Sequence, residues 1–159
     1  MKNIKIGFSC SSSWKIGSAA LKWYMDTEYS HAYIRYQDSQ DRDVVFQAAH
    51  GTVHPILFEN FIKENKVTHE FEIEFSHEEY QKLRNFYYSE MGKPYAYKDL
   101  FIILAYDTCK KIGIKVQDGN IPGYICSQLA ATVLSEIKGY KFDKPLNLVR
   151  PNDLFKKLE

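Results

Sequence analysis

Residues 123–139, GYICSQLAATVLSEIKG, predict a helix that carries Cys126 in its first turn and ends at Gly139. An apolar stripe shares the face of the thiol and consists of Leu129, Ala130, Val133 and Ile137. Burying that stripe would direct Cys126 toward the sheet on which the helix packs. Free backbone N–H groups and the positive end of the helix dipole favour a thiolate at a helix start. The pattern therefore predicts a nucleophilic cysteine.

A second signal is a β-hairpin made by His31–Tyr36 and Val44–Ala49, which are rich in aromatic and β-branched residues and flank the polar stretch QDSQDRD. His31 opens the first strand and is the best candidate for the general base. If paired residue numbers sum to 78 or 80, His31 and Gln47 share one face. The Gln47 amide oxygen would then accept the imidazole N–H and fix the ring. A slip of one residue would bring His50 there instead.

The rest of the chain alternates irregularly between strands and helices. The predicted elements are a strand at 2–9, a helix at about 18–25, a break at Pro55, a short helix within ILFENFIKEN, and a strand in THEFEIEF with Phe71, Ile73 and Phe75 on one side. Ser76 and Glu79 form a capping box for a helix that ends near Met91, a further helix covers 97–112, and RPNDLFKKLE forms a last capped turn. This order predicts one compact α+β domain spanning residues 1–159.

Composition limits the class of protein. The 159 residues are 45% hydrophobic, which is enough for one buried core, and their net charge of +1 is spread without a basic stripe. Nucleic acid is therefore not an expected partner. No run is long enough to span a membrane, and the start MKNIKIGFSC lacks the apolar core of a secretion signal, so we expect synthesis in the cytoplasm. The sequence does not indicate an oligomeric state.

The cysteines and histidines allow alternative sites. Cys10, Cys109 and Cys126 lack the spacing of a disulfide framework or a zinc ribbon, and Cys10, in a serine-rich loop, is the competing nucleophile. His50 and His54 suggest zinc, but Gly51 and Pro55 oppose the helix that would place both on one face, so neither a metal nor a cofactor is expected. A cysteine on an apolar helix face more often serves packing. That structural interpretation stays open for the residues taken singly.

The segments YSHAYIRY, VVFQAAHGTVHPILFENF and YICSQLAATVL, followed by LVRPNDLF, resemble the circularly permuted branch of the NlpC-type cysteine peptidase superfamily. The resemblance spans nearly the whole chain and implies a papain-like fold, in which an antiparallel sheet packs against the helix that bears the cysteine. It assigns His31 as the base, Gln47 in FQA as the third polar residue, and Cys126 with Ser127 as the nucleophile motif. The family commonly has His or Glu at the position of Gln47.

The resemblance implies a thiol-dependent hydrolase that acts on peptide or isopeptide bonds, such as those of bacterial cell wall. A wall substrate would require delivery by a holin, a virion or lysis. The same superfamily includes relatives of lecithin retinol acyltransferase, so a lipid acyl hydrolase or acyltransferase is the alternative enzyme. A catalytically silent binding domain is the third possibility, because an amide stabilises imidazolium less than a carboxylate does. The backbone N–H of Cys126 is the expected oxyanion donor.

Overall fold

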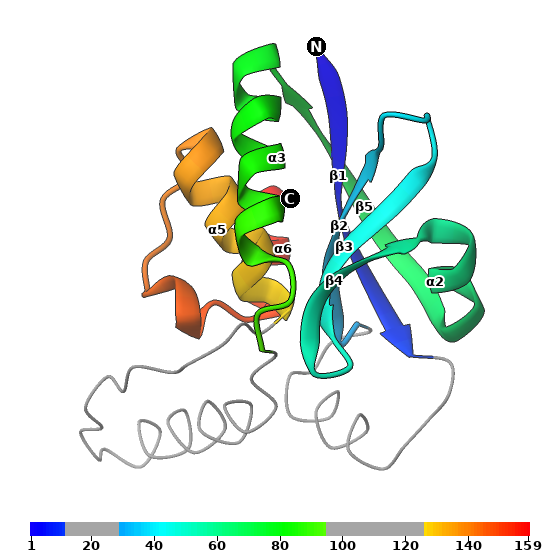
Figure 1. Cartoon of the computed structure of the whole chain (residues 1–159). Coiled ribbons are helices and arrows are strands. Elements are labelled where there is room, and N and C mark those ends of the chain that lie inside the picture. The colour runs from blue at the N-terminus through cyan, green and yellow to red at the C-terminus, as the bar shows by residue number, and fades with distance from the viewer. Residues whose placement is uncertain (12–28, 95–125) are drawn as a thin grey trace.

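The computed structural model describes residues 1–11, 29–94 and 126–159, which form one antiparallel sheet and the helices around it (Figure 1). The strand order across the sheet is β4-β3-β2-β1-β5. The strands are β1 (Lys2–Ser11), β2 (His31–Gln37), β3 (Asp43–Ala49), β4 (Thr52–Leu57) and β5 (Asn65–Phe75). The helices are α2 (Phe58–Glu64), α3 (His77–Glu90), α5 (Cys126–Lys138), the 3₁₀ turn η1 (Leu146–Leu148) and α6 (Pro151–Leu158). The predicted α+β class is confirmed.

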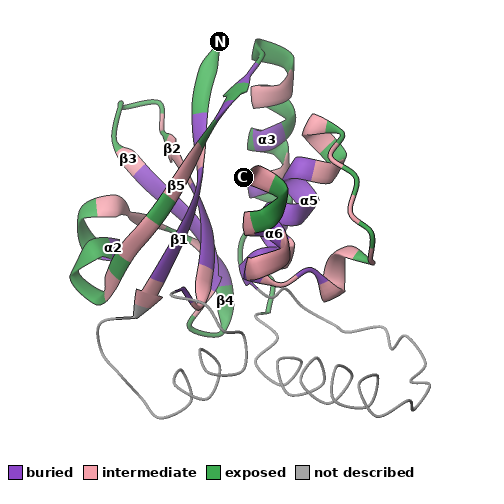
Figure 2. Ribbon diagram, turned by 180° about the vertical axis from the view of Figure 1, so that it is seen from behind, coloured by how far each residue is buried: buried purple, intermediate pink, exposed green. Residues whose placement is uncertain are grey.

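The two faces of the sheet carry different helices. Helices α3, α5 and α6 cover one face, whereas the short helix α2 lies on the other (Figures 1 and 2). The main core fills the space under the three helices, where the buried side chains concentrate (Figure 2). A second, smaller cluster on the α2 side contains Tyr33, Val45 and Phe61. The sheet is thus buried on both faces, but unequally.

The hairpin of β2 and β3 has one of the two predicted registers. Ile34 pairs with Phe46 and Arg35 with Val45, so the residue numbers of opposite residues sum to 80. With side chains alternating along each strand, this register places the odd-numbered residues of both strands on the α2 face. The register selects Gln47, and not His50, for the face of His31.

Pro55 does not break the chain, contrary to the sequence prediction. It lies within β4, where it pairs with Phe46 of β3. β4 is an edge strand, with β3 as its only neighbour in the sheet of the described residues. An edge strand tolerates proline because the missing N–H can fall on the side that faces no partner. A second correction concerns Cys10, which lies in β1 and not in a loop.

Several predicted boundaries are confirmed. β5 alternates as expected, with Ile73 and Phe75 buried, although it begins earlier than predicted, at Asn65. Helix α3 opens with the capping box, in which the Ser76 hydroxyl accepts the Glu79 N–H at 3.2 Å and the Glu79 carboxylate accepts the Ser76 N–H at 2.7 Å. Helix α5 stops before Gly139, whose φ of +73° suits glycine. The helices predicted at 18–25 and 97–112 lie outside the described residues.

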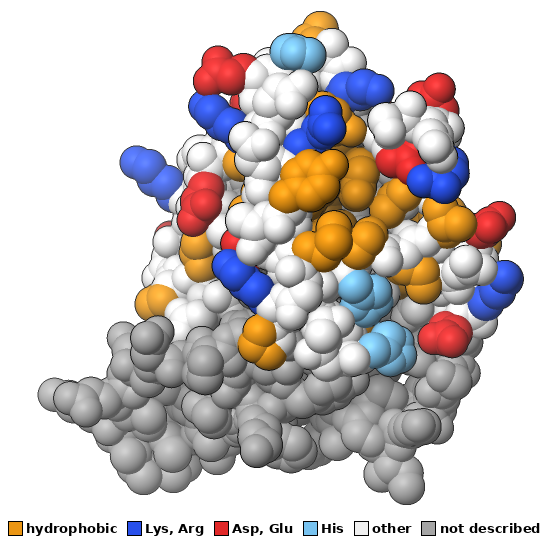
Figure 3. All heavy atoms as spheres, in the orientation of Figure 1, with side chains coloured by type: hydrophobic (Ala, Val, Ile, Leu, Met, Phe, Trp, Pro, Cys, Tyr) orange, Lys and Arg blue, Asp and Glu red, His pale blue; other side chains and the backbone are white. Residues whose placement is uncertain are grey.

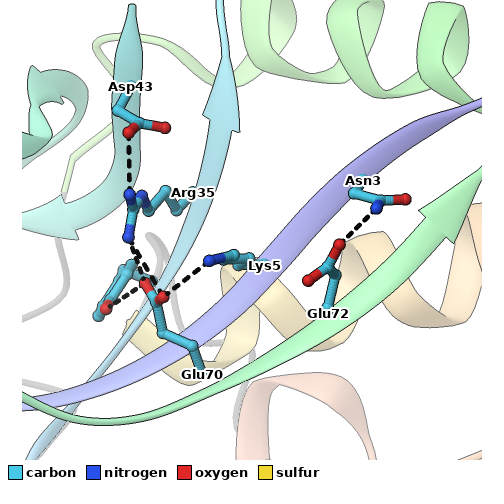
Figure 4. A network of polar contacts seen from close by, with 7 residues as sticks. Asn3, Lys5, Arg35, Asp43, Glu70 and Glu72 are labelled. Atoms are coloured by element: carbon cyan, nitrogen blue, oxygen red, sulfur yellow. Dashed lines mark hydrogen bonds and ion pairs between the residues drawn. The ribbon is translucent and has the colours of Figure 1, made fainter.

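A polar network crosses the α2 face of the sheet (Figure 4). The Arg35 guanidinium on β2 donates to Asp43 of β3 at 2.9 Å and to both oxygens of Glu70 on β5 at 3.2 Å. Lys5 of β1 pairs with the same Glu70 at 3.4 Å, and Asn3 donates to Glu72 beside it. Four strands are therefore linked by side chains as well as by their backbone.

Hydrophobic side chains gather at the surface on the side of the molecule that carries α3 (Figure 3), and aromatic rings pack beneath that helix. Tyr87 of α3 contacts Tyr36 and Phe46 with ring centroids 4.7 and 4.4 Å apart, whereas Tyr88 is 68% exposed. These contacts dock α3 on the sheet. None of the described helices is long and apolar enough to cross a membrane.

Candidate active site

Cys126 begins helix α5, and the helix packs on β2 and β3 through the predicted apolar stripe. Leu129, Ala130 and Val133 of that stripe are fully buried, and Cys126 itself is 6% exposed. The thiol lies against the backbone N–H of Ala32, the residue that follows His31 in β2. The start of the helix and the start of the strand therefore meet at one end of the sheet (Figure 1).

The strands β2 and β3 part at this end. Their pairing within the described sheet stops at Ile34 and Phe46, although β2 begins at His31 and β3 continues to Ala49. The unpaired strand ends leave the Ala32 N–H available to a side chain. The Cys126 thiol, which comes from the opposite face, takes that place. The opening therefore brings the first residue of helix α5 next to the backbone of the strand that carries His31.

His31 and Gln47 are in direct contact across the opening. Nε2 of the imidazole lies 2.8 Å from Oε1 of the Gln47 amide. An amide oxygen only accepts, so Nε2 carries the hydrogen and Nδ1 keeps its lone pair. Gln47 is only 3% exposed, and its burial holds the amide in place. The predicted pair is thus brought together in the structure, with Nδ1 of His31 as the basic nitrogen.

The surroundings of His31 oppose its protonation. Its ring lies near the rings of Tyr33 and Phe61, with centroids 6.5 and 6.2 Å away. Burial lowers the pKa of His31 to about 4, and the charges of His50 and His54 lower it further. The hydrogen bond that His31 donates to Gln47 raises the pKa, but burial outweighs it. The imidazole is therefore neutral at physiological pH.

The Cys126 thiol is also neutral in this environment, which differs from the sequence prediction of a thiolate. Burial raises the pKa of Cys126 above the value of a free thiol. The backbone N–H groups of Ala32, Ser127 and Cys126 lower it, as the position at a helix start predicts, but burial outweighs them. The Cys126 thiol and the His31 imidazole are thus both neutral at rest.

Two other histidines lie near His31 and Gln47, and the first of them, His50, does not contact the Gln47 amide. It sits in the β3–β4 turn with a φ of +48° and a largely exposed side chain whose nearest ionic partner is Glu64, at 3.8 Å. The sequence analysis considered His54 only as a possible zinc ligand and did not place it beside Gln47. It lies opposite Gln47 on β4, and its Nε2 is 3.4 Å from Nε2 of that amide. Extending the alternating strand pattern through Pro55 would have identified it.

Ser127 anchors the start of helix α5. Its hydroxyl donates to the backbone carbonyl of Val149 at 2.6 Å, and both residues are fully buried. This hydrogen bond connects the start of α5 to the segment before α6. The serine next to the cysteine therefore has a structural role. Sequence spacing alone gives no sign of the Val149 partner.

Of the other two cysteines, one lies in the sheet and one lies outside the described residues. Cys10 pairs with Lys66 between β1 and β5, and Cys109 falls in a part of the chain that the structure does not describe. Among the described residues, no group of three or more His, Cys, Asp or Glu side chains is placed to hold a metal ion. Compared with known proteins, the chain matches no protein-family model and no curated protein sequence.

Proposed function

We propose that the protein is a cysteine hydrolase of the peptidase and amidase type, with a permuted papain-like arrangement of His31, Gln47 and Cys126. The observation that carries the proposal is the hydrogen bond of 2.8 Å from Nε2 of His31 to Gln47. The Cys126 thiol lies against the backbone N–H of Ala32, the next residue after His31 in β2. The hydrogen bond to Gln47 leaves Nδ1 as the proton acceptor. Among the described residues, no other side chain gives Nδ1 a hydrogen bond.

In the first half of the reaction, Nδ1 of His31 takes the proton of the Cys126 thiol as the sulfur attacks the substrate carbonyl carbon. The C–N bond then breaks, and the imidazolium returns its proton to the leaving amine, which forms a thioester on Cys126. The Cys126 backbone N–H at the helix start is the oxyanion donor in this proposal. The Ala32 N–H stabilises the sulfur while it carries negative charge.

In the second half, Nδ1 takes a proton from water, whose oxygen attacks the thioester carbonyl. The C–S bond breaks, the acid leaves, and the proton on His31 returns to the sulfur. The starting thiol and neutral imidazole are thereby restored. Because the resting pair is neutral, proton transfer accompanies attack and does not precede it. Gln47 keeps the ring oriented through both halves.

The substrate proposed is a peptide or isopeptide amide, including the cross-bridges of bacterial cell wall, in line with the superfamily that the sequence resembles. A binding domain without turnover is the second candidate, and the observation in its favour is the raised pKa of the Cys126 thiol. A buried neutral thiol is a poor nucleophile until a base is engaged. The two candidates differ in whether an acyl group ever becomes attached to the sulfur.

The test is to incubate the protein with purified peptidoglycan, with isopeptide-linked peptides, and separately with phospholipid and acyl-thioester substrates. Products and the intact protein mass are followed by mass spectrometry. Cys126→Ala and His31→Ala are expected to abolish turnover, whereas Cys10→Ala retains it. A mass increase equal to one acyl group, absent in Cys126→Ala, would identify the thioester. Turnover of lipid substrates alone would favour the acyltransferase alternative, and no acylation in any mixture would favour the binding domain.

A further inference from the structure

The contacts of Gln47 continue beyond His31 to a second histidine. Nε2 of the Gln47 amide lies 3.4 Å from Nε2 of His54, a long hydrogen bond. On its other side, Nδ1 of His54 lies 3.1 Å from the backbone carbonyl oxygen of Thr52 and 3.5 Å from the Thr52 hydroxyl. Two imidazoles are therefore joined through one amide, and the line ends on a main-chain carbonyl.

One assignment of hydrogens satisfies every contact in this line. The Thr52 carbonyl only accepts, so Nδ1 of His54 carries a hydrogen and its Nε2 has the lone pair. That lone pair requires the NH₂ group of Gln47, which turns the amide oxygen toward His31. Nε2 of His31 then carries its hydrogen, and Nδ1 is left basic. The tautomer of His31 thus depends on the Thr52 carbonyl through three successive contacts, which join Thr52 to His54, His54 to Gln47 and Gln47 to His31.

We propose that His54 is a positioning residue that selects the basic tautomer of His31 through the Gln47 amide, and that a proton on His54 reverses the selection. This inference rests on the proposed function, because it assigns a role to His54 in the same reaction. With Nε2 protonated, His54 only donates, so the Gln47 amide rotates to present its oxygen. Its NH₂ group then faces Nε2 of His31 and moves the imidazole hydrogen to Nδ1. His31 can no longer take the thiol proton.

The third residue must be an amide for this coupling to exist. A carboxylate only accepts, so it would keep accepting from Nε2 of His31 whatever the state of His54, and would leave the tautomer of His31 unchanged. Gln47 has one donating and one accepting end, so a change at one end must reverse the other. In this proposal the amide at position 47, where the family that the chain resembles commonly has His or Glu, has a function of its own.

The charged groups around His54 come from several elements. The His50 ring in the preceding turn lies 6.3 Å away between centroids, and Glu64 of α2 lies 3.8 Å from His50. The backbone of Lys93 after α3 accepts from Val53 next to His54, and its side chain pairs with Glu90. His31 faces His54 through Gln47, and the charge of His54 lowers the pKa of His31. His50 is therefore the control for a charge that is near the line of contacts but outside it.

The direct test measures the ring nitrogen shifts of His31 by ¹⁵N NMR across acid to neutral pH, in the wild type, His54→Gln and His50→Asn. A Gln at 54 keeps an accepting oxygen and does not titrate. The expected wild-type result is hydrogen on Nε2 at neutral pH and a move of that hydrogen to Nδ1 on acidification, while the ring of His31 is still neutral. His54→Gln is expected to keep the Nε2–H form until His31 itself titrates, and His50→Asn to behave as the wild type. One tautomer throughout in the wild type, or a shift that persists in His54→Gln, would overturn the proposal.

Kinetics supply the second readout. Replacing His54 with Gln is expected to shift the acid limb of kcat/KM to lower pH, toward the pKa of His31, which burial lowers to about 4. His54→Lys, which only donates, is expected to lower kcat at least tenfold at neutral pH with little change in KM. An acid limb that stays in place in His54→Gln would refute the coupling. If the protein has no hydrolase activity, the NMR result still decides the tautomer coupling by itself, so the two failures are distinguishable.

Discussion

The Nε2 atom of His31 lies 2.8 Å from Oε1 of Gln47, and this contact joins two strands beyond the point where their ladder has ended. A side-chain hydrogen bond therefore replaces backbone pairing at the open end of the β2–β3 hairpin, beyond Ile34 and Phe46. The parting of the strands admits the Cys126 thiol to the Ala32 N–H. The end of the β2–β3 ladder, the contact of His31 with Gln47 and the contact of Cys126 with Ala32 thus occur at one place in the sheet.

The first prediction concerns Gln47. Gln47→Ala removes the acceptor that orients His31, and we expect kcat to fall roughly 10²-fold, the usual cost of a misplaced catalytic group. Gln47→Glu restores an acceptor and stabilises the imidazolium, so activity should largely return with the acid limb at higher pH. The measurement is kcat against pH for both variants. Equal losses in the two variants would show that Gln47 does not act as an acceptor.

A second prediction is that His31 makes folding stability depend on pH. Its pKa is about 4 in the folded chain and about 6.5 in an unfolded chain, so the unfolded chain binds more protons between these values. The contribution is fully present above the unfolded value and is lost as the pH falls toward 4. From pH ~7.5 to pH ~5 we expect a loss of about 2 kcal/mol in the free energy of unfolding.

Urea unfolding of the wild type and of His31→Gln at both pH values checks this contribution. The difference in stability between the two pH values should be smaller in His31→Gln by about that amount. His69→Gln removes an exposed histidine of β5 and serves as the matched control. An identical pH dependence in His31→Gln and the wild type would contradict the lowered pKa.

The third prediction concerns the reactivity of Cys126 without substrate. Because burial raises its pKa, we expect the pH midpoint of its alkylation by iodoacetamide to lie above the value of about 8.5 for a free thiol. Peptide mass spectrometry can follow Cys10 and Cys126 in the same sample, together with a small thiol as reference. A midpoint well below the free value that rises in His31→Ala would instead reveal a preformed thiolate and imidazolium.

The fourth prediction tests Gly7 of β1. A Cβ at this position would overlap the ring of Tyr33, which is fully buried and reaches across β1 to donate to Glu70 at 3.0 Å. Gly7→Ala should therefore lower the free energy of unfolding by roughly 1–3 kcal/mol. In a Tyr33→Val background the ring is gone, and the same substitution should cost much less. An equal cost in both backgrounds would mean that the strain has another origin.

The fifth prediction concerns Ser127. Ser127→Ala leaves the buried carbonyl of Val149 without its donor at 2.6 Å, and we expect a loss of about 1–3 kcal/mol in stability. Ser135→Ala, in the same helix but only half-buried, is the control and should cost less. Thermal unfolding of the two variants compares them directly. A larger effect at 135 would refute the anchoring role of Ser127.

Local signals in the sequence were sufficient for the elements that they predicted correctly. The capping box of Ser76 and Glu79, the stop at Gly139 and the alternation of β5 all depend on residues within a few positions of one another. The shared face of His31 and Gln47 also followed from the sequence, because side chains alternate along a hairpin in either register. The grouping of these residues with Cys126 rested on the resemblance of their ordered motifs to a known superfamily, and it stays a prediction.

Only the tertiary structure decided the rest. Pro55 belongs to a strand because β4 is at the edge, and strand order depends on pairing between β1 and β5, which are far apart in sequence. Cys126 is neutral because the packed sheet and helix exclude water, and burial is a property of the whole fold. His54 reaches Gln47 through cross-strand pairing. The sequence determined which groups are present and which way they face, whereas packing determined their protonation and their partners.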